Sequence, residues 1–241
     1  MVMPEETTAH DFREVIETII CGRPPIIVGG HAVNIWAIRY EQRIGAEISQ
    51  FQPFTSKDLD VYGTCELLDA LHARLGGTKR LSEPRSPVVG KIEVELAGRH
   101  RSIDVLHSVR GLNAKDLEVV VPVKLDGLIA LVPAPIKLLK AKIGNVATLD
   151  QTNRNDVKHL KMILLCQREF IVDFLDAAEA GDMTPRAVVN LLTETRTITG
   201  SSEAQNVARH WEIDYNSVWP WSRLEESPLD KVRNFLAHHY P

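Results

Sequence analysis

The stretch FTSKDLDVYG, residues 54–63, places Asp58 and Asp60 two positions apart in a run that is typical of a strand. In an extended chain, residues i and i+2 point to the same face of the sheet. Two neighbouring carboxylates repel each other, so the pattern suits a strand that binds a cation or an edge strand that carries surface acids. Both readings predict a strand here, and the first predicts a functional site.

Two further segments favour the cation-binding strand. Upstream, PPIIVGG (residues 24–30) predicts a short strand that ends in a tight turn at Gly29 and Gly30, before a helix over 31–42. Such a turn can offer backbone N–H groups to a phosphate. Downstream, Asp104 lies between two apolar residues in RSIDVLHSV. If its strand neighbours the first, Asp58, Asp60 and Asp104 converge, and their oxygen ligands suit Mg²⁺ or Mn²⁺.

The third aspartate is expected to lie in a β-hairpin. KIEVELAG and RSIDVLHSV alternate apolar and polar residues and are separated by Arg99 and His100. With these two residues as the turn, Glu95 is expected to face Asp104 across the hairpin. Like charges directly opposite each other are unfavourable, which again indicates a bound cation.

The pattern changes along the chain. Strand-type alternation dominates up to about residue 130, and the spacing of apolar residues is helical afterwards. We expect an α+β fold, with a small mixed β-sheet and flanking helices in residues 1–130 and a helical C-terminal domain in residues 131–241. The helical segments are expected at 136–147, 155–167, 169–181, 184–199, 202–211 and 227–240.

The composition of the chain bears on its cellular compartment, on membrane insertion and on the charge of its ligand. The chain has 241 residues and three widely spaced cysteines without a CxxC pair, which disfavours a disulfide framework and predicts small buried thiols in a reducing compartment. The N-terminal stretch MVMPEETTAH lacks the apolar core of a signal peptide, and charges and prolines interrupt the most apolar run. We therefore expect a cytoplasmic protein without a membrane span. Between Lys79 and Lys161, 15 Lys and Arg stand against 9 Asp and Glu, which fits either a solvated surface of mixed charge or a site for a polyanionic ligand.

The ordered motifs IIVGGHAV, SKDLDVYG and RSIDVLHS resemble the polymerase-β-like nucleotidyltransferase superfamily, whose pattern is hG[GS], Dh[DE]h and h[DE]h, where h is hydrophobic. Within it, the chain is most similar to the AbiEii-type toxin nucleotidyltransferases. The later stretch PAPIKLLKAKIGNVATLDQTNRNDVKHLKMIL is similar to their helical segment. The resemblance covers about residues 25–165 and implies a nucleotidyltransferase core for the predicted sheet.

The resemblance implies roles for residues in each of these motifs. Gly29 and Gly30 would hold the phosphates of the nucleotide. The three aspartates would bind the metal ions, and Asp104 would also activate the acceptor hydroxyl. Lys142 or Lys140 would neutralise phosphate; because two residues on a helix differ in direction by about 200°, we expect Lys142 to face the nucleotide. The remaining two motif positions are Asp156, which matches the first acid of a later pair, and His159, which stands where the second acid is usual.

The implied activity is metal-dependent transfer of a nucleoside monophosphate from an NTP to an acceptor hydroxyl. An RNA acceptor, tRNA in particular, and an antitoxin partner follow from the toxin resemblance. A small molecule or a protein as acceptor, and a non-catalytic nucleotide-binding relative of the fold, are the alternatives. The motifs for a P-loop, a Rossmann fold and a HExxH zinc site are absent from the sequence.

Overall fold

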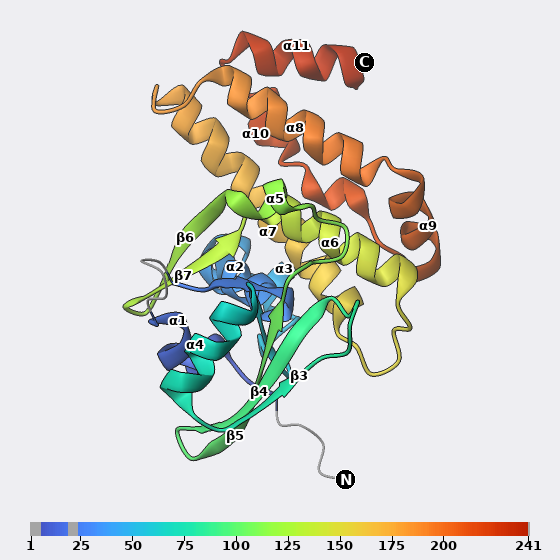
Figure 1. The fold of residues 1–241 in the computed structure, drawn as a ribbon. Coiled ribbons are helices and arrows are strands. Elements are labelled where there is room, and N and C mark those ends of the chain that lie inside the picture. The colour runs from blue at the N-terminus through green and yellow to red at the C-terminus, as the bar shows by residue number, and fades with distance from the viewer. Residues whose placement is uncertain (1–5, 19–23, 241) are drawn as a thin grey trace.

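The computed structural model describes residues 6–18 and 24–240, in which seven strands form one mixed sheet in the order β3–β4–β5–β2–β1–β7–β6 (Figure 1). The β1–β7 and β2–β5 pairs are parallel, and the other neighbouring pairs are antiparallel. The strands are β1 (Ile26–Val28), β2 (Leu59–Tyr62), β3 (Thr78–Leu81), β4 (Val88–Leu96), β5 (Arg99–Leu106), β6 (Val120–Leu125) and β7 (Leu128–Pro133).

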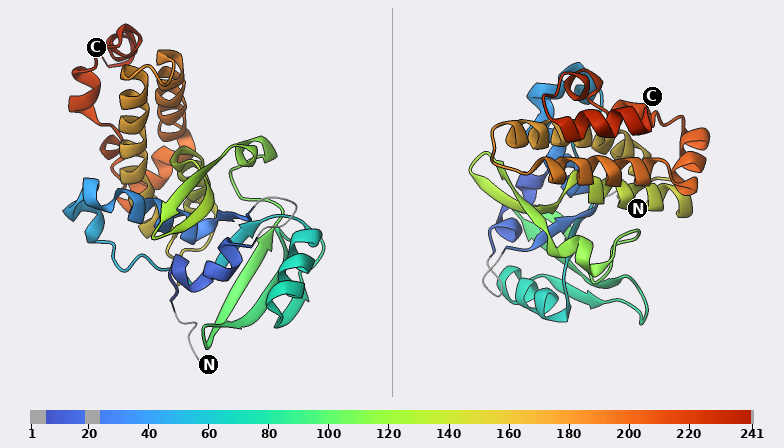
Figure 2. Two further views of the ribbon diagram at one scale, coloured as in Figure 1. Left: turned by 90° about the vertical axis from the view of Figure 1, so that its left-hand side faces the viewer. Right: turned by 90° about the horizontal axis from the view of Figure 1, so that it is seen from above.

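Helices flank the sheet and form the C-terminal part of the chain, which rises above the sheet in Figure 1 and on one side of it in Figure 2. The predicted α+β class, with a mixed sheet followed by a helical region, is confirmed. The helical elements are η1 (Ala9–Phe12), α1 (Arg13–Ile16), α2 (Gly29–Ile44), α3 (Ala46–Ser49), α4 (Cys65–Leu75), α5 (Ala114–Glu118), α6 (Pro135–Thr148), α7 (Asp156–Glu179), α8 (Pro185–Thr199), α9 (Ser202–Trp211), η2 (Tyr215–Val218), α10 (Trp221–Glu225) and α11 (Asp230–His239).

The division of the chain at residue 130 stays a prediction. Strand β7 extends across this position and pairs with β1 and β6, and the first helix of the C-terminal region, α6, begins at Pro135. The proline suits the first turn of a helix, where its missing N–H would have no partner. In the described part of the chain, no helix is both long and apolar enough to cross a membrane.

The two faces of the sheet differ in character. In β2, Leu59 and Val61 are fully buried in the main core, which also contains apolar side chains of α2 and α4. Because side chains alternate along a strand, Asp60 points to the opposite face. A second, smaller core of Ile26, Val28 and Leu117 covers part of that opposite face. The acidic positions of β2 therefore lie on the face that the main helical layer leaves open.

The register of the β4–β5 hairpin differs from the predicted one. Leu96 pairs with Arg99, so the turn is Ala97–Gly98, and both turn residues have positive φ. Asp104 consequently pairs with Lys91 and not with Glu95. A two-residue turn with positive φ at both positions matches the twist of a hairpin, which explains why it forms two residues earlier than expected. The predicted pair of opposed acids was wrong, and an opposed acid and base takes its place.

Several element boundaries also differ. The segments 155–167 and 169–181 form one helix, α7, because apolar residues continue across the junction at helical spacing. Strands β3 and β7 were not predicted. The apolar residues of DFREVIETII, residues 11–20, have helical spacing and predict a helix there; in the structure η1 and α1 end at Ile16, and residues 19 and 20 lie outside the described residues. Of the cysteines, Cys166 is buried as expected and Cys65 is exposed, contrary to expectation; Cys21 lies outside the described residues.

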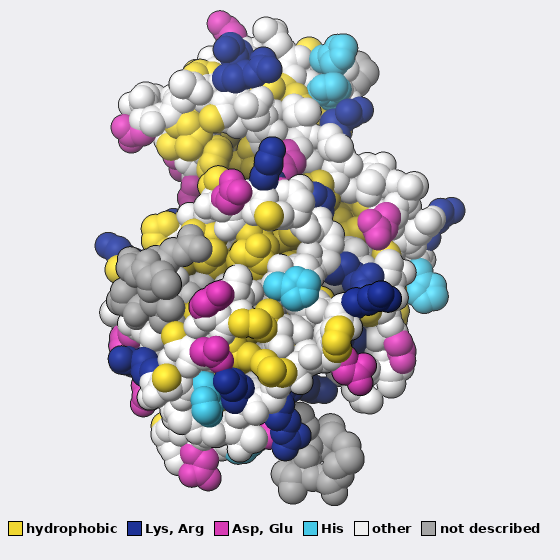
Figure 3. Space-filling model, in the orientation of Figure 1, with side chains coloured by type: hydrophobic (Ala, Val, Ile, Leu, Met, Phe, Trp, Pro, Cys, Tyr) yellow, Lys and Arg dark blue, Asp and Glu magenta, His cyan; other side chains and the backbone are white. Residues whose placement is uncertain are grey.

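Charged side chains of both signs are interspersed over the face of the molecule shown in Figure 3. Lys and Arg gather at the right of the middle of this view, over the connection between β3 and β4. The net charge of the chain is −4, so any attraction for a polyanion has to come from such local groups.

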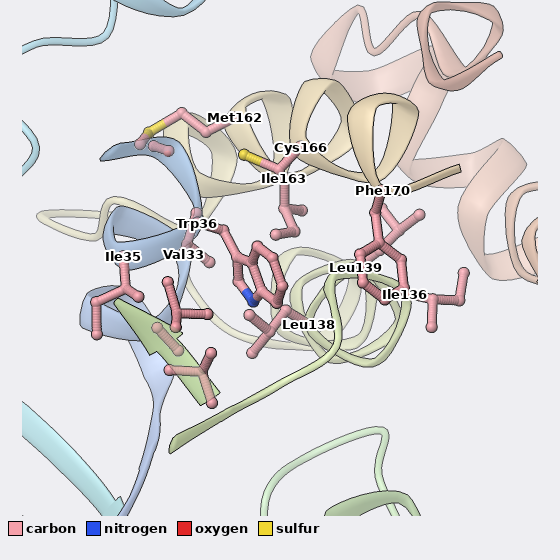
Figure 4. Close-up of a cluster of buried hydrophobic side chains, with 14 of the residues drawn as sticks. Val33, Ile35, Trp36, Ile136, Leu138, Leu139, Met162, Ile163, Cys166 and Phe170 are labelled. Carbon is pink, nitrogen blue, oxygen red and sulfur yellow. The ribbon is translucent and has the colours of Figure 1, made fainter. Parts of the chain in front are cut away.

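A buried cluster joins the sheet to the C-terminal helices (Figure 4). Trp36 of α2 is fully buried between α6 and α7, and its indole Nε1–H donates a hydrogen bond of 2.9 Å to the carbonyl oxygen of Pro133. The ring meets Phe170 of α7 edge-on, with centroids 5.5 Å apart. Aromatic side chains bury a large area and such pairs add about 1 kcal/mol. This packing fixes the positions of α6 and α7 relative to β1 and α2.

We predict that Trp36→Ala lowers the free energy of unfolding by about 3–5 kcal/mol, because it removes a large buried ring. Trp36→Phe should cost less, about 1–3 kcal/mol, since it leaves the buried Pro133 carbonyl without its donor but keeps most of the packing. Urea denaturation measures both. Ile129→Ala, at a side chain that is 50% exposed, is the control and should cost little. Equal costs for Trp36→Ala and Ile129→Ala would contradict this description of the core.

Candidate active site

Strand pairing brings the predicted aspartates to one place. Asp60 of β2 pairs directly with Asp104 of β5 in the parallel register, and Asp58 precedes β2 by one residue. All three carboxylates line one cavity of about 240 Å³. The other lining residues come from the loop before β2, the start of α2, α6, and the start of α7 with the loop before it: Gly30, Ser56, Lys57, Lys142, Asn153, Arg154, Asn155, Asp156 and His159.

The two glycines at the start of α2 allow a close approach to this cavity. Gly29 has φ +65°, and a Cβ there would lie 1.9 Å from Oδ2 of Asp60. A Cβ on Gly30 would lie 2.4 Å from Oγ of Ser56 and 2.8 Å from Cε1 of His159. Any side chain at these positions would therefore displace the residues of the cavity. Packing explains both glycines, and the positive φ is a second reason for Gly29.

Negative charge accumulates in the cavity. Burial raises the pKa of Asp60 to about 7, and the charges of Asp104 and Asp58 add to the rise, whereas Lys142 opposes it. Burial also raises the pKa of Asp104; the charge of Asp58 acts in the same direction and that of Lys91 against it. Ionised carboxylates are thus unfavourable here without an additional positive charge.

Lys91 of β4 supplies part of that charge. Its Nζ lies 3.4 Å from Oδ1 of Asp104 and 3.8 Å from Oδ1 of Asp58. The contact with Asp104 is an ion pair, and within residues 6–18 and 24–240 the buried Oδ1 atom of Asp104 has no hydrogen-bond partner. The two carboxylates raise the pKa of Lys91 although burial opposes this, and the ammonium group therefore stays charged. Sequence reasoning missed Lys91 because it placed the hairpin turn two residues too late.

A second charged group lies on the helical side of the cavity. Lys142 of α6 is buried, and its Nζ donates a hydrogen bond of 2.7 Å to Oδ1 of Asp156, the first residue of α7. Arg154 Nε donates to the other oxygen at 2.6 Å, and Asn145 Nδ2 lies 3.3 Å from Oδ1. Burial alone would raise the pKa of Asp156, but Lys142 and Arg154 hold it well below its usual range. Asp156 thus holds two cationic side chains, Lys142 and Arg154, at the cavity wall.

The structure separates the two candidate lysines. Lys142 lines the cavity, whereas Lys140 points elsewhere on α6 and lies 3.3 Å from Asp116 of α5. Asp116 also pairs with Lys137 at 2.9 Å. Lys140 is therefore not brought to the cavity with the other predicted residues.

His159, which stands at the place of the usual second acid, also lines the cavity. It is buried, and burial together with the charge of Lys142 lowers its pKa well below the usual value. Its Nε2 atom has no hydrogen-bond partner within the described residues. The imidazole is therefore neutral, and its Nε2 atom is buried.

The donor set was tested for a metal ion. Across residues 6–18 and 24–240, no group of three or more His, Cys, Asp or Glu side chains has the spacing of a formed metal site. The chemistry nevertheless fits a hard divalent cation, because the cavity presents carboxylate oxygens, one of them buried without a hydrogen bond. The raised pKa of Asp60 has the same origin, an excess of negative charge. Asp58, Asp60 and Asp104 are the residues that could hold such an ion.

No family model matches the chain, and no curated protein matches it. A solved structure that does match is the crystal structure of an antigenic nucleotidyltransferase-like protein from Paracoccidioides brasiliensis. The match has a TM-score of 0.40 at 10% sequence identity and covers 66% of this chain and 78% of the other. We therefore base the function on the residues of the cavity.

We predict that Asp60→Asn stabilises the metal-free protein at alkaline pH. Because the pKa of Asp60 is raised to about 7 in the folded state, ionisation of this group destabilises the fold progressively as pH rises from about 4 to 7. With EDTA at pH 8, the free energy of unfolding of the variant should exceed that of the wild type by on the order of 1–4 kcal/mol. The difference should shrink toward pH 4.

Denaturant titrations at several pH values measure this difference. Asp126→Asn, at an exposed side chain on the β6–β7 turn, is the control and should show no comparable trend. A pH-independent difference between wild type and Asp60→Asn would rule out the described electrostatics.

Proposed function

We propose that this protein is a metal-dependent nucleotidyltransferase that moves a nucleoside monophosphate from an NTP to an acceptor hydroxyl. The observation that carries the proposal is the registered pair Asp60–Asp104, which shares one cavity with Asp58, the Gly29–Gly30 turn and buried Lys142. Carboxylates in this arrangement next to cationic side chains suit a phosphate substrate that arrives with a divalent cation.

Each residue of the cavity has a defined task in this reaction. Asp58, Asp60 and Asp104 would hold Mg²⁺ or Mn²⁺, which would supply positive charge to the phosphates of the NTP. Lys142 and Arg154 balance phosphate charge, and Asp156 keeps both of them in place. The close approach at Gly29 and Gly30 lets the N-terminus of α2 face the phosphates.

The transfer itself is an in-line displacement. The acceptor hydroxyl oxygen bonds to the α-phosphorus while the bond to pyrophosphate breaks. Asp104 takes the hydroxyl proton, and the raised pKa of its carboxyl makes it a better base than an ordinary aspartate. Pyrophosphate leaves, and Lys142 and Arg154 balance its negative charge. No covalent enzyme intermediate is needed.

RNA is the proposed acceptor. The resemblance of the sequence to AbiEii-type toxins favours tRNA as the acceptor and a separate antitoxin protein as partner. The basic segment between Lys79 and Lys161 contributes Lys91, Lys142 and Arg154 to the surroundings of the cavity. A small-molecule or protein acceptor, or loss of catalysis, would appear as alternative outcomes of the experiment that follows.

We predict that the purified protein, given Mg²⁺ and each α-labelled NTP in turn, labels total cellular RNA. Asp58→Ala and Asp60→Ala should each lower the rate by at least about a hundredfold, because each removes a ligand of the metal. The folded state should be retained, since loss of a carboxylate relieves repulsion when no cation is bound.

The control is Asp182→Ala, an exposed residue beyond α7, which should keep the wild-type rate. Gel analysis identifies the labelled species. Labelling of a protein or of a small molecule would identify that species, and not RNA, as the acceptor. Absence of transfer with every NTP and acceptor, or equal rates in wild type and Asp60→Ala, would contradict the proposed activity.

A separate prediction concerns Lys91, whose ammonium group contacts two of the proposed ligands. Lys91→Met should lower the melting temperature in EDTA, because it removes the positive charge beside Asp104 and Asp58. It should also enlarge the rise in melting temperature on adding Mg²⁺ or Mn²⁺, since the ammonium group and the cation compete for the same carboxylates.

Thermal melts with and without metal measure both effects. Lys231→Met, at an exposed lysine of α11, is the matched control and should respond to metal as the wild type does. If metal raises the melting temperature of Lys91→Met no more than that of the wild type, Lys91 does not share ligands with the cation.

A further inference from the structure

A second cavity adjoins the candidate active site. It has a volume of about 670 Å³ and shares Asp60 and Arg154 with the first cavity. Gly29, whose neighbour Gly30 lines the first cavity, also lines the second. A group bound in either cavity therefore reaches the same carboxylate. An in-line transfer needs two substrates that meet at the reacting phosphorus, and adjoining cavities provide places for both.

The lining of the second cavity is basic. Arg85, Arg110 and Arg154 face it together with His107, and Asp60 is its one acidic lining residue. Among the described residues, neither Arg85 nor Arg110 has an ion-pair partner. The first cavity, by contrast, is lined by four aspartates, Asp58, Asp60, Asp104 and Asp156. The two cavities thus differ in charge, and the second favours an anion without a metal.

The segments that carry the two arginines contact neighbouring elements. The backbone N–H of His107 donates to the carbonyl oxygen of Pro87 at 3.1 Å, and its Nε2 lies 2.8 Å from the carbonyl oxygen of Ser86. These bonds tie the loop after β5 to the connection that carries Arg85. Arg110 lies against α6, since a Cβ on Gly144 would stand 3.7 Å from Cγ of Arg110. Both arginines are exposed at the cavity, on segments that contact neighbouring elements.

The cavity also has an apolar part, which comes from β1, the end of β5 and the segments on either side. A flat apolar group beside guanidinium groups is the environment that a nucleobase and its phosphate require. The apolar lining residues are Val28, Pro87, Val88, Leu106, Val109, Leu112 and Leu149.

A third cavity extends the path away from the active site. It has a volume of about 780 Å³, shares Leu149 with the second cavity and is also lined by His210 and Trp211 of α9. Its lining has Asp150 and Glu203 and no Lys or Arg, so it could contribute the aromatic ring of Trp211 for stacking on a base but no positive charge for phosphate. A mononucleotide would fill one cavity, whereas a strand would run along consecutive ones.

We propose that the second cavity binds the acceptor end of a single-stranded RNA, with Arg85 and Arg110 on its phosphodiester groups and the apolar residues beneath the terminal base. This proposal rests on the proposed nucleotidyltransferase activity and names the place where the acceptor binds. The triphosphate of the NTP has Lys57, Lys142 and Arg154 in the first cavity, so Arg85 and Arg110 serve the other substrate.

The test measures binding of a fluorescently labelled short single-stranded RNA to the full chain by anisotropy, over a range of salt concentrations. Arg85→Ala and Arg110→Ala should each weaken binding about tenfold, because each removes charge-assisted hydrogen bonds to phosphate. Each should also reduce the salt dependence by about one unit of log–log slope. The lysine variants Arg85→Lys and Arg110→Lys should restore most of the salt slope, since they keep the charge.

Two further measurements separate this site from the nucleotide site. The rise in melting temperature on adding NTP with Mg²⁺ should be the same in wild type, Arg85→Ala and Arg110→Ala. Arg186→Ala, at an exposed arginine of α8, is the matched control and should bind RNA as the wild type does. Wild-type melting temperatures without ligand would show that the variants fold.

The outcomes distinguish the two proposals. Unchanged RNA binding in both arginine variants would overturn the acceptor site, even if the protein transfers nucleotide. Loss of NTP binding with normal RNA binding would overturn it as well, because the cavity would then belong to the nucleotide. Loss of RNA binding in a protein that transfers no nucleotide would support the cavity as an RNA site and reject the proposed activity.

Discussion

Repulsion between carboxylates on the open face of the sheet is the constraint on which the rest of this structure depends. The parallel register of β2 and β5 sets Asp60 directly beside Asp104, and Asp58 lines the same cavity. Burial and mutual repulsion raise the pKa of Asp60 to about 7. A fold that keeps such a cluster must compensate it with positive charge. The surrounding strands and helices supply this positive charge through their lysine side chains.

Two lysines supply positive charge to the cavity from different elements. Lys91 comes from β4 through strand pairing and contacts Asp58 and Asp104. Lys142 comes from α6, and its position depends on the cluster around Trp36 that holds α6 and α7 against α2. The helical region therefore contributes to the candidate site and also packs beside the sheet. Neither lysine neutralises Asp60 fully, because its pKa stays raised in their presence.

Local patterns in the sequence predicted much of this arrangement. Strand alternation placed Asp58 and Asp60 on one face, and the Gly29–Gly30 turn between strand and helix lies beside Asp60 in the structure. The helical spacing after residue 130 predicted the C-terminal helices. These features depend on short-range periodicity and on the special backbone conformation of glycine, which a single sequence expresses directly.

Features that depend on pairing between distant segments were not predicted. The turn at Ala97–Gly98, which sets the register of the hairpin, decides that Lys91 faces Asp104, and both candidate turns fit the same alternation of apolar residues. The hydrogen bond from Lys142 of α6 to Asp156 of α7 and the cavity that Arg85 and Arg110 line arise from segments that pack together only in three dimensions. Periodicity carries no information on such contacts.

The most direct test of the central claim is anomalous diffraction from crystals of the protein soaked with Mn²⁺ and a non-hydrolysable NTP. The account predicts an anomalous peak within coordination distance of carboxylate oxygens of both Asp60 and Asp104, about 2.0–2.3 Å away. It also predicts that Nζ of Lys91 moves away from Asp104. A peak at other residues, or an unchanged Lys91–Asp104 ion pair at saturating Mn²⁺ with no peak between the aspartates, would contradict the account.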